Sequence, residues 1–309
     1  MTPARLIGEN EASIPGNGRL DQSFPMRILV TGSTGFVGSH LLVELLQAQH
    51  EVVAVRRSGS EPVIPLEDQP IWLDRSLLEL TANDLEGVEV VIHLASAGVS
   101  PKMAPWKELE QINVATGLQL IQLANQAGVR RFVAAGTCLE YGSEAEAWDR
   151  ILPSASLRPI TPYAASKAAA FLMLQAYSIA HPIQLFYGRI FTAYGEGQFG
   201  KCLWPSLRQA AMIGDDFSMT AGEQIADFIP VADVVRHLRI AAERCDLQPA
   251  QPLVVNIGSG QGMRLVDFAR QQWKHFGATG CLKPGAIPPR PGQLARIVAD
   301  PINLNPPTN

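Results

Sequence analysis

From residue 26 onward, short runs of apolar and β-branched residues alternate with longer segments whose apolar positions recur at helical spacing. Runs of the first kind predict strands, at Arg27–Thr31, Glu51–Val55, Glu89–His93, Arg131–Ala135 and Ile183–Tyr187. Segments of the second kind predict helices, from Phe36 to Gln47, Trp106 to Gln126 and Tyr163 to Ala180. This alternation is typical of βαβ units and predicts an α/β fold, a Rossmann-type doubly wound parallel sheet.

The pattern changes after about residue 190, where Gly and Pro become more frequent. Helices are expected near 201–213, 231–244 and 264–276, separated by short extended pieces. We therefore expect a Rossmann domain over 26–190 that carries the catalytic residues, and a smaller C-terminal α/β lobe over 191–309 that is interleaved with it and binds substrate. Residues 1–25 show neither the strand pattern nor the helical spacing of apolar residues, and they are expected to form a flexible extension.

A glycine-rich turn joins the first expected strand to the first expected helix. Glycines at 32, 35 and 38 allow a tight turn, close approach of the backbone to a pyrophosphate, and close packing of helix on sheet. The start of the helix adds free N–H groups and the positive end of its dipole. The expected dinucleotide contacts are Gly32, Thr34, Gly35, Phe36, Val37 and Gly38.

Two arginines follow the second strand, at Arg56 and Arg57. An NAD-selective site usually places an acidic residue there for the ribose 2′-hydroxyl, whereas an NADP site uses arginine for the 2′-phosphate. The sequence therefore favours NADP(H) over NAD(H).

A tyrosine and a lysine stand one helical turn apart, at Tyr163 and Lys167. A nearby ammonium lowers the pKa of a phenol, so Tyr163 is a candidate general acid and base that Lys167 tunes. Thr137 ends the fifth strand, where ligands of open α/β sheets bind, and its hydroxyl is a candidate contact for the substrate oxygen.

Composition narrows the class of partner. The chain has 309 residues, 47% of them hydrophobic, a formal net charge of −4, and no basic run longer than two residues, which argues against nucleic acid and membrane surfaces and favours a small-molecule ligand. The four cysteines form no Cys-x-x-Cys pair, so reduced thiols and no metal site are expected. With neither a secretion signal nor a long apolar stretch, a cytoplasmic location is expected.

Several motifs in order resemble the extended short-chain dehydrogenase/reductases, a superfamily of sugar-nucleotide epimerases, dehydratases and reductases. They are Gly32-x-x-Gly35-x-x-Gly38, His93-Leu94-Ala95-Ser96-Ala97, Thr137 with Tyr141-Gly142, and Tyr163-x-x-x-Lys167. The likeness continues through 189–195, 222–234 and 256–260. It implies a catalytic triad of Thr137, Tyr163 and Lys167.

The same resemblance implies further contacts. Lys167 and Tyr163 would also touch the cofactor, as would Asp74, Leu94, Ala95 and Ala97, while Cys138, Arg189 and Thr192 would join Thr137 in contacting substrate. The C-terminal lobe would hold the nucleotide. Relatives often dimerise through the helix that contains Tyr163 and the one before it, so a homodimer is expected.

The reaction is less sharply defined. Dehydratases usually carry an Asp-Glu pair after the catalytic threonine, and Cys138 and Leu139 stand there instead. Reduction of a nucleotide-linked 4-keto-6-deoxy sugar is the first expectation, because the arginines favour NADPH and because 222–235 resembles reductases of the CDP-abequose synthase type. The alternatives are an NAD-dependent nucleotide-sugar 4-epimerase, a reductase of small carbonyl compounds, and a non-catalytic NADP-binding sensor or scaffold.

Overall fold

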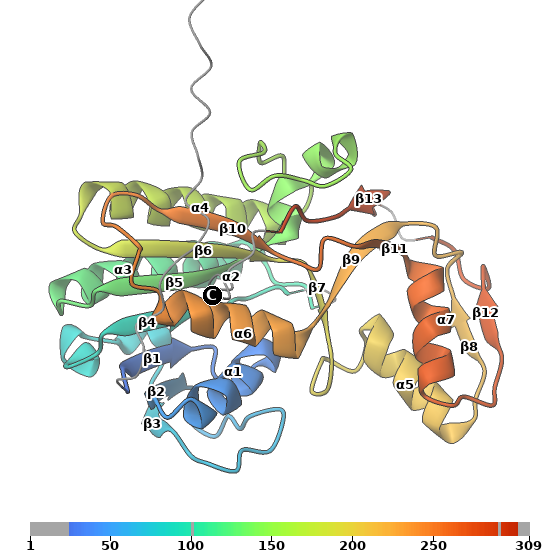
Figure 1. Cartoon of the computed structure of the whole chain (residues 1–309), viewed down its shortest axis with the longest axis horizontal. Helices are drawn as coiled ribbons and strands as arrows, with labels where there is room; N and C mark the ends of the chain where they lie inside the picture. The colour runs from blue at the N-terminus through green and yellow to red at the C-terminus, as the bar shows by residue number, and fades with distance from the viewer. Residues whose placement is uncertain (1–24, 100–101, 290–291, 302–309) are drawn as a thin grey trace, which may run out of the picture.

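The computed structural model describes residues 25–99, 102–289 and 292–301, and its centre is one parallel sheet (Figure 1). Seven strands lie in the order β10-β6-β5-β4-β1-β2-β3. Their bounds are β1 Arg27–Thr31, β2 Glu51–Arg56, β3 Ile71–Asp74, β4 Val90–His93, β5 Arg131–Thr137, β6 Gln184–Ile190 and β10 Leu253–Ile257. All neighbouring pairs are parallel, which confirms the expected Rossmann-type fold. The expected extension lies, apart from residue 25, outside the described residues.

Helices cover both faces of this sheet (Figure 1). One face packs against α1 (Phe36–Gln47) and α6 (Val231–Glu243), and the other against α3 (Thr116–Gln126) and α4 (Pro162–Ala180). Successive side chains of β1 serve both layers: Ile28 and Val30 join the first core and Leu29 the second. Because both faces are buried, the strands read as nearly continuous apolar runs rather than as alternating ones.

The helix expected from Trp106 to Gln126 is interrupted. It divides into α2 (Trp106–Leu109), a π-helical turn η3 (Glu110–Ala115) and α3. Within this turn the buried Asn113 accepts from the N–H of Ala97 at 2.8 Å and donates to the Ser166 hydroxyl at 2.8 Å. The wider turn therefore has an amide that links the loop after β4 to α4, a use typical of π-turns near functional sites.

The C-terminal part contributes to both lobes. α6 and β10 complete the Rossmann layers, while the remaining elements form the smaller lobe (Figure 1). That lobe contains β7 Thr192–Tyr194, α5 Leu203–Ile213, β8 Phe217–Met219, β9 Ile225–Pro230, β11 Gly262–Arg264, α7 Leu265–His275, β12 Leu282–Pro284 and β13 Arg296–Ile297. Short 3₁₀ turns occur at η1 Leu77–Glu79, η2 Ala82–Leu85, η4 Cys138–Tyr141 and η5 Ser143–Ala147.

A buried aspartate joins the two lobes. The Asp227 carboxylate on β9 accepts from the N–H and hydroxyl of Ser259, at 2.7 and 2.6 Å, just beyond β10. Its other oxygen accepts from the N–H groups of Gly260 at 2.8 Å and Ala299 at 3.1 Å. Four donors to one carboxylate compensate for the loss of its hydration.

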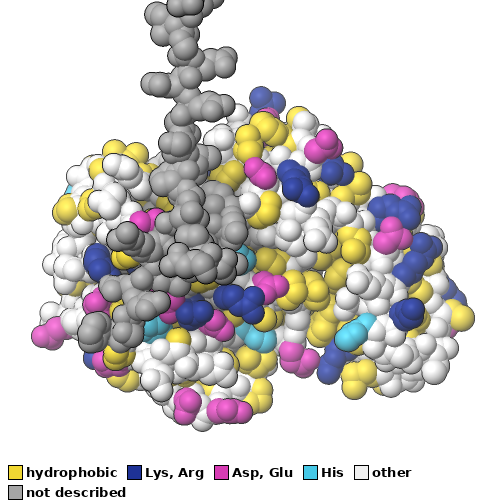
Figure 2. Space-filling view, in the orientation of Figure 1, with side chains coloured by type: hydrophobic (Ala, Val, Ile, Leu, Met, Phe, Trp, Pro, Cys, Tyr) yellow, Lys and Arg dark blue, Asp and Glu magenta, His cyan; other side chains and the backbone are white. Residues whose placement is uncertain are grey.

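The molecular surface seen in the orientation of Figure 1 carries charges of both signs. Figure 2 shows Lys and Arg side chains interspersed with Asp and Glu over both lobes. Within the described ranges, no helix combines the length and the apolar character needed to cross a membrane.

Asp227→Ala should lower the free energy of unfolding by about 3 kcal/mol or more, because three N–H groups lose their acceptor, those of Gly260 and Ala299 in buried hydrogen bonds. Urea denaturation measures this difference. Asp233→Ala is the matched control, since Asp233 is an exposed residue of the same segment that pairs with Arg236 at the surface. Equal midpoints for the two variants would contradict the role given to Asp227.

Candidate active site

The glycine turn after β1 is built around two close backbone approaches. Gly32 has a φ of +68°, and a Cβ there would lie 2.7 Å from the backbone nitrogen of Ala95. A Cβ at Gly38 would lie 2.1 Å from the carbonyl oxygen of Gly32. Only glycine fits these two positions, so the helix packs tightly against the turn.

The start of α1 leaves backbone donors available. Gly35 is its N-cap and provides no side-chain cap, so the first N–H groups of the helix keep their capacity to bind an anion. Thr34, Phe36 and Val37 lie half-buried around the turn. Leu94, Ala95 and Ala97 follow β4, and the first two contact Gly32 across the crevice. These features fit a dinucleotide pyrophosphate.

Arg56 has a different environment from the one expected. Its Nε donates to the Asp74 carboxylate at 2.8 Å, and its Nη1 lies 3.2 Å from Glu61. The guanidinium stacks on the Trp72 ring, 4.3 Å from the ring centroid. Two carboxylates and an aromatic face already occupy this group, so a 2′-phosphate would have to displace them. Arg57 is exposed.

The catalytic pair lies in the first turns of α4. Thr161 caps this helix by accepting from the N–H of Ala164 at 3.2 Å, and Pro162 occupies its first position. Lys167 is buried, and its Nζ donates to the carbonyl oxygen of Ala135 on β5 at 2.7 Å. Thr137 is the last residue of β5, so the sheet and α4 bring the three predicted catalytic residues to one edge.

Burial dominates the ionisation of this pair. It raises the pKa of the Tyr163 phenol, the neighbouring Ser96 side chain opposes the shift, and the negative charge of Glu140 reinforces it. Burial lowers the pKa of the Lys167 ammonium, and Glu140 partly restores it. The sequence led us to expect a lowered phenol pKa; the structure gives a raised one, because desolvation is the largest effect on the phenol. Tyr163 is therefore held protonated, as a general acid requires.

Two polar residues of the site were missed by the sequence analysis. The Ser96 hydroxyl donates to Asn113 at 3.0 Å, and Asn113 in turn donates to Ser166, whose hydroxyl donates to the carbonyl oxygen of Tyr163 at 2.8 Å. This chain links the loop after β4 to the first turn of α4. Isolated Ser and Asn residues give no signal in a single sequence until the π-turn brings them together.

His93, in contrast, has no acid or base role. Burial, together with the positive charge of Lys167, lowers its pKa to about 3, and its Nδ1 lies 2.7 Å from the Thr31 hydroxyl. The ring is neutral at physiological pH and links the ends of β1 and β4.

The residues predicted to contact substrate lie in different environments. Cys138 is buried beside Thr137, and burial with the charges of Asp227 and Glu140 raises its pKa to about 12. Thr192 lies half-buried on β7. Arg189 was expected to contact substrate, but its side chain is 1% exposed and forms an ion pair with Glu140 at 2.7 Å. Arg189 is therefore committed to the core behind the site, a position that its motif did not reveal.

This arrangement is that of a nicotinamide-dependent Rossmann enzyme. A family model described as the NAD dependent epimerase/dehydratase family matches residues 28–258. The chain belongs to this family, and the expectation that it is an enzyme is confirmed.

Individual relatives span nearly the whole chain. The UDP-glucose 4-epimerase of Erwinia amylovora is 28% identical, over 89% of this chain and 90% of its own length. Among solved structures, TunA, an NAD dependent NDP-hexosamine 5,6-dehydratase of tunicamycin biosynthesis, is 32% identical with a TM-score of 0.77, covering 89% of this chain and 88% of its own. MoeE5 in complex with UDP-glucuronic acid and NAD is 30% identical with a TM-score of 0.75, covering 89% of both.

The expected preference for NADP(H) is wrong. The similar structures are described as NAD dependent or contain NAD. The physical reason is the pairing of Arg56 with Asp74 and Glu61, which removes the free guanidinium on which the expectation depended.

Gly38→Ala should reduce the affinity for NADH by about tenfold or more, or about 1.4 kcal/mol, because the new methyl group would overlap the carbonyl oxygen of Gly32. Fluorescence titration with NADH measures this loss. Gly200→Ala serves as the control, since a Cβ there meets nothing within 4 Å. An affinity unchanged by Gly38→Ala would argue against a dinucleotide site at this turn.

Proposed function

We propose that this protein is a nucleotide-sugar 4-epimerase that retains NAD and acts on UDP-hexoses. The relatives named above include a UDP-glucose 4-epimerase and a UDP-glucuronic acid complex, and they favour this reading over a 4-ketoreductase of the CDP-abequose synthase type. The glycine turn, the helix start and the loop after β4 would hold the dinucleotide.

Epimerisation needs one proton moved out and back at a single oxygen. The NAD held by the glycine turn and the start of α1 would supply a reversible acceptor for the hydride of the sugar carbon. Tyr163 would take the proton of the sugar hydroxyl as the phenolate, which it must form against its raised pKa, and would return that proton when the hydroxyl is restored. Thr137 would donate a hydrogen bond to the same oxygen. The positive charge of Lys167 would stabilise the phenolate before the proton is taken and after it is returned.

One observation carries the choice between epimerase and dehydratase. Elimination of water needs its own acid and base, which the family usually supplies directly after the threonine. In this chain Cys138 is a neutral buried thiol, with a pKa of about 12, and Leu139 is apolar. The nearest carboxylate in that segment, Glu140, is held by Arg189. The site therefore favours a reaction that moves only a hydride and one proton.

A cavity in the smaller lobe supports a nucleotide as part of the substrate. It has a volume of about 270 Å³ and is lined by the segment 220–224 together with Gly285, Ile287 and Gln293. Its lining combines the amides of Gln224 and Gln293, the carboxylate of Glu223 and apolar side chains, and this mixture of hydrogen-bonding groups and an apolar wall suits a flat base.

Purified protein should convert UDP-glucose, UDP-N-acetylglucosamine or UDP-glucuronic acid to the 4-epimer without net change in NADH, as followed by chromatography of the products. Tyr163→Phe should lower turnover by about a hundredfold or more while NADH still binds. Tyr177→Phe is the matched control, because Tyr177 lies on the same helix but stacks on His181.

Other products would overturn the proposal. An unsaturated sugar would indicate a dehydratase, and stoichiometric NADH oxidation with a 4-keto sugar would indicate the reductase. Tight NADH binding with no turnover of any sugar would favour a sensor or scaffold.

We also propose that the protein forms a homodimer through α4. α4 exposes Leu172, Met173 and Ile179, which lie on one side of the helix by their spacing. Such a face is apolar enough to pack against a second copy.

Light scattering should therefore report a dimer, and replacement of Leu172 and Ile179 by Glu should give a monomer that still binds NADH. Met212→Glu is the control, because Met212 is an equally exposed apolar residue on α5. A wild-type monomer would contradict the proposed interface.

A further inference from the structure

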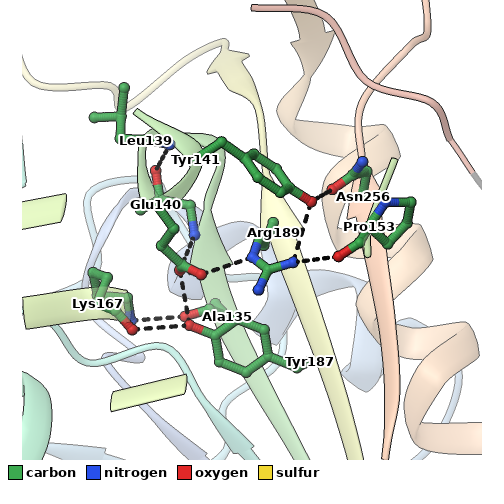
Figure 3. Close-up of polar contacts among 10 residues, drawn as sticks. Ala135, Leu139, Glu140, Tyr141, Pro153, Lys167, Tyr187, Arg189 and Asn256 are labelled. Atoms are coloured by element: carbon green, nitrogen blue, oxygen red, sulfur yellow. Dashed lines mark hydrogen bonds and ion pairs between the residues drawn. The ribbon is translucent and has the colours of Figure 1, made fainter. Parts of the chain in front are cut away.

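Glu140 carries a fully buried carboxylate, which contacts Tyr187 and Arg189 (Figure 3). Glu140 is on the short turn η4 that follows β5. Its Oε1 accepts from the N–H of Thr137 and from the Tyr187 hydroxyl, each at 2.8 Å. Its Oε2 accepts from Nε of Arg189 at 2.7 Å. Both oxygens therefore have partners, one in the catalytic triad and one in the core.

Local capping does not account for this arrangement. Thr137 and Glu140 form a capping box for η4, a motif that serves equally well at an exposed turn. Here the carboxylate is instead buried with an arginine that is 1% exposed. Removing both charges from water costs free energy that a packed apolar pair would avoid, so stability alone gives no reason for the ion pair.

The backbone makes room for the carboxylate. A Cβ at Gly136 would lie 2.7 Å from Oε1 of Glu140 and 2.3 Å from a ring carbon of Tyr187. Glycine at this position therefore allows Glu140 to approach β5, next to the carbonyl oxygen of Ala135 that accepts from Lys167.

Contacts with three other residues fix the position of the Arg189 side chain. Its Nη1 donates to the Pro153 carbonyl oxygen at 2.9 Å and to the Tyr141 hydroxyl at 3.1 Å, and its guanidinium lies 4.5 Å from the Phe171 ring centroid. The Tyr141 hydroxyl donates in turn to Asn256 on β10 at 2.6 Å (Figure 3). We call Glu140, Arg189, Tyr187, Tyr141 and Asn256 the Glu140 network.

We propose that Glu140 is a positioning residue of the catalytic site, which holds the backbone of Thr137 and places a fixed negative charge beside Lys167. This role rests on the proposed hydride-transfer function. The titratable and charged groups around Glu140 are Lys167 and Tyr163 on α4, Tyr187 and Arg189 on β6, and Cys138 and Tyr141 on η4.

The charge of Glu140 acts on both catalytic groups of α4. Glu140 raises the pKa of Lys167 against the effect of burial, and it also raises the pKa of Tyr163. Arg189 contacts the other carboxylate oxygen, Oε2, whereas Oε1 accepts from Thr137 in the triad. The network therefore presents its negative end to the site and keeps Lys167 protonated to higher pH.

Glu140→Gln tests this role, because it keeps the shape and removes the charge. Loss of the anion lowers the pKa of Lys167. As the pH rises, Lys167 therefore loses its proton earlier, and any property that needs its ammonium is lost earlier in the same titration. Lys167 is expected to contact the cofactor ribose, and NADH affinity should fall as pH rises through its pKa. We expect this alkaline limb to move down by about one pH unit in the variant. Fluorescence titration of NADH across pH measures it without any sugar.

Two further variants separate charge from structure. Tyr187→Phe removes a hydrogen bond to Oε1 of Glu140 but no charge. It should therefore leave the midpoint of the alkaline limb of NADH affinity unchanged. The double variant Glu140→Gln with Arg189→Gln leaves no uncompensated buried charge, so it keeps the test open if the single variant does not fold. It should still show the downward shift.

The results distinguish this inference from the proposed function. A shifted NADH limb in a protein that turns over no UDP-sugar would sustain the role of Glu140 and refute the epimerase. Turnover with a limb that stays in place in Glu140→Gln, or one that moves equally in Tyr187→Phe, would overturn the role of Glu140 and leave the epimerase standing.

Discussion

The tightest constraint in this protein is the contact between two stretches of backbone at Gly32 and Gly38. A methyl group at either position would overlap neighbouring main-chain atoms, so the first helix can approach the sheet only because both residues are glycine. That approach points the free N–H groups of α1 at the crevice beyond the strands. Parallel strands then bring the loop after β4 and the end of β5 to the same edge, and the site is assembled there.

Burial is the second determinant, because it sets the protonation states. It keeps His93 neutral, raises the pKa of the Tyr163 phenol and lowers the pKa of the Lys167 ammonium. A buried lysine would lose its charge without a compensating anion, and Glu140 is placed to provide one. The same carboxylate needs Arg189 to be tolerated in the core, so the electrostatics of the site extend through the sheet to β6 and β10.

The two lobes depend on each other through similar buried polar contacts. Asp227 on β9 satisfies donors that follow β10 and β13, and α6 and β10 return from the C-terminal half to complete the Rossmann layers. The cavity of the smaller lobe is thereby attached to the lobe that holds the glycine turn.

The sequence by itself determined the fold class, the dinucleotide turn and the pair Tyr163 and Lys167, because these depend on spacing within one element or one turn. Only the tertiary structure decided what depends on residues distant in the chain. Asp74 and Glu61 occupy Arg56 and reverse the cofactor preference, Glu140 draws Arg189 into the core, and a π-turn brings Asn113 to the site. Periodicity reports which face of an element is buried, but the partner that a buried charge meets is set by how the elements pack.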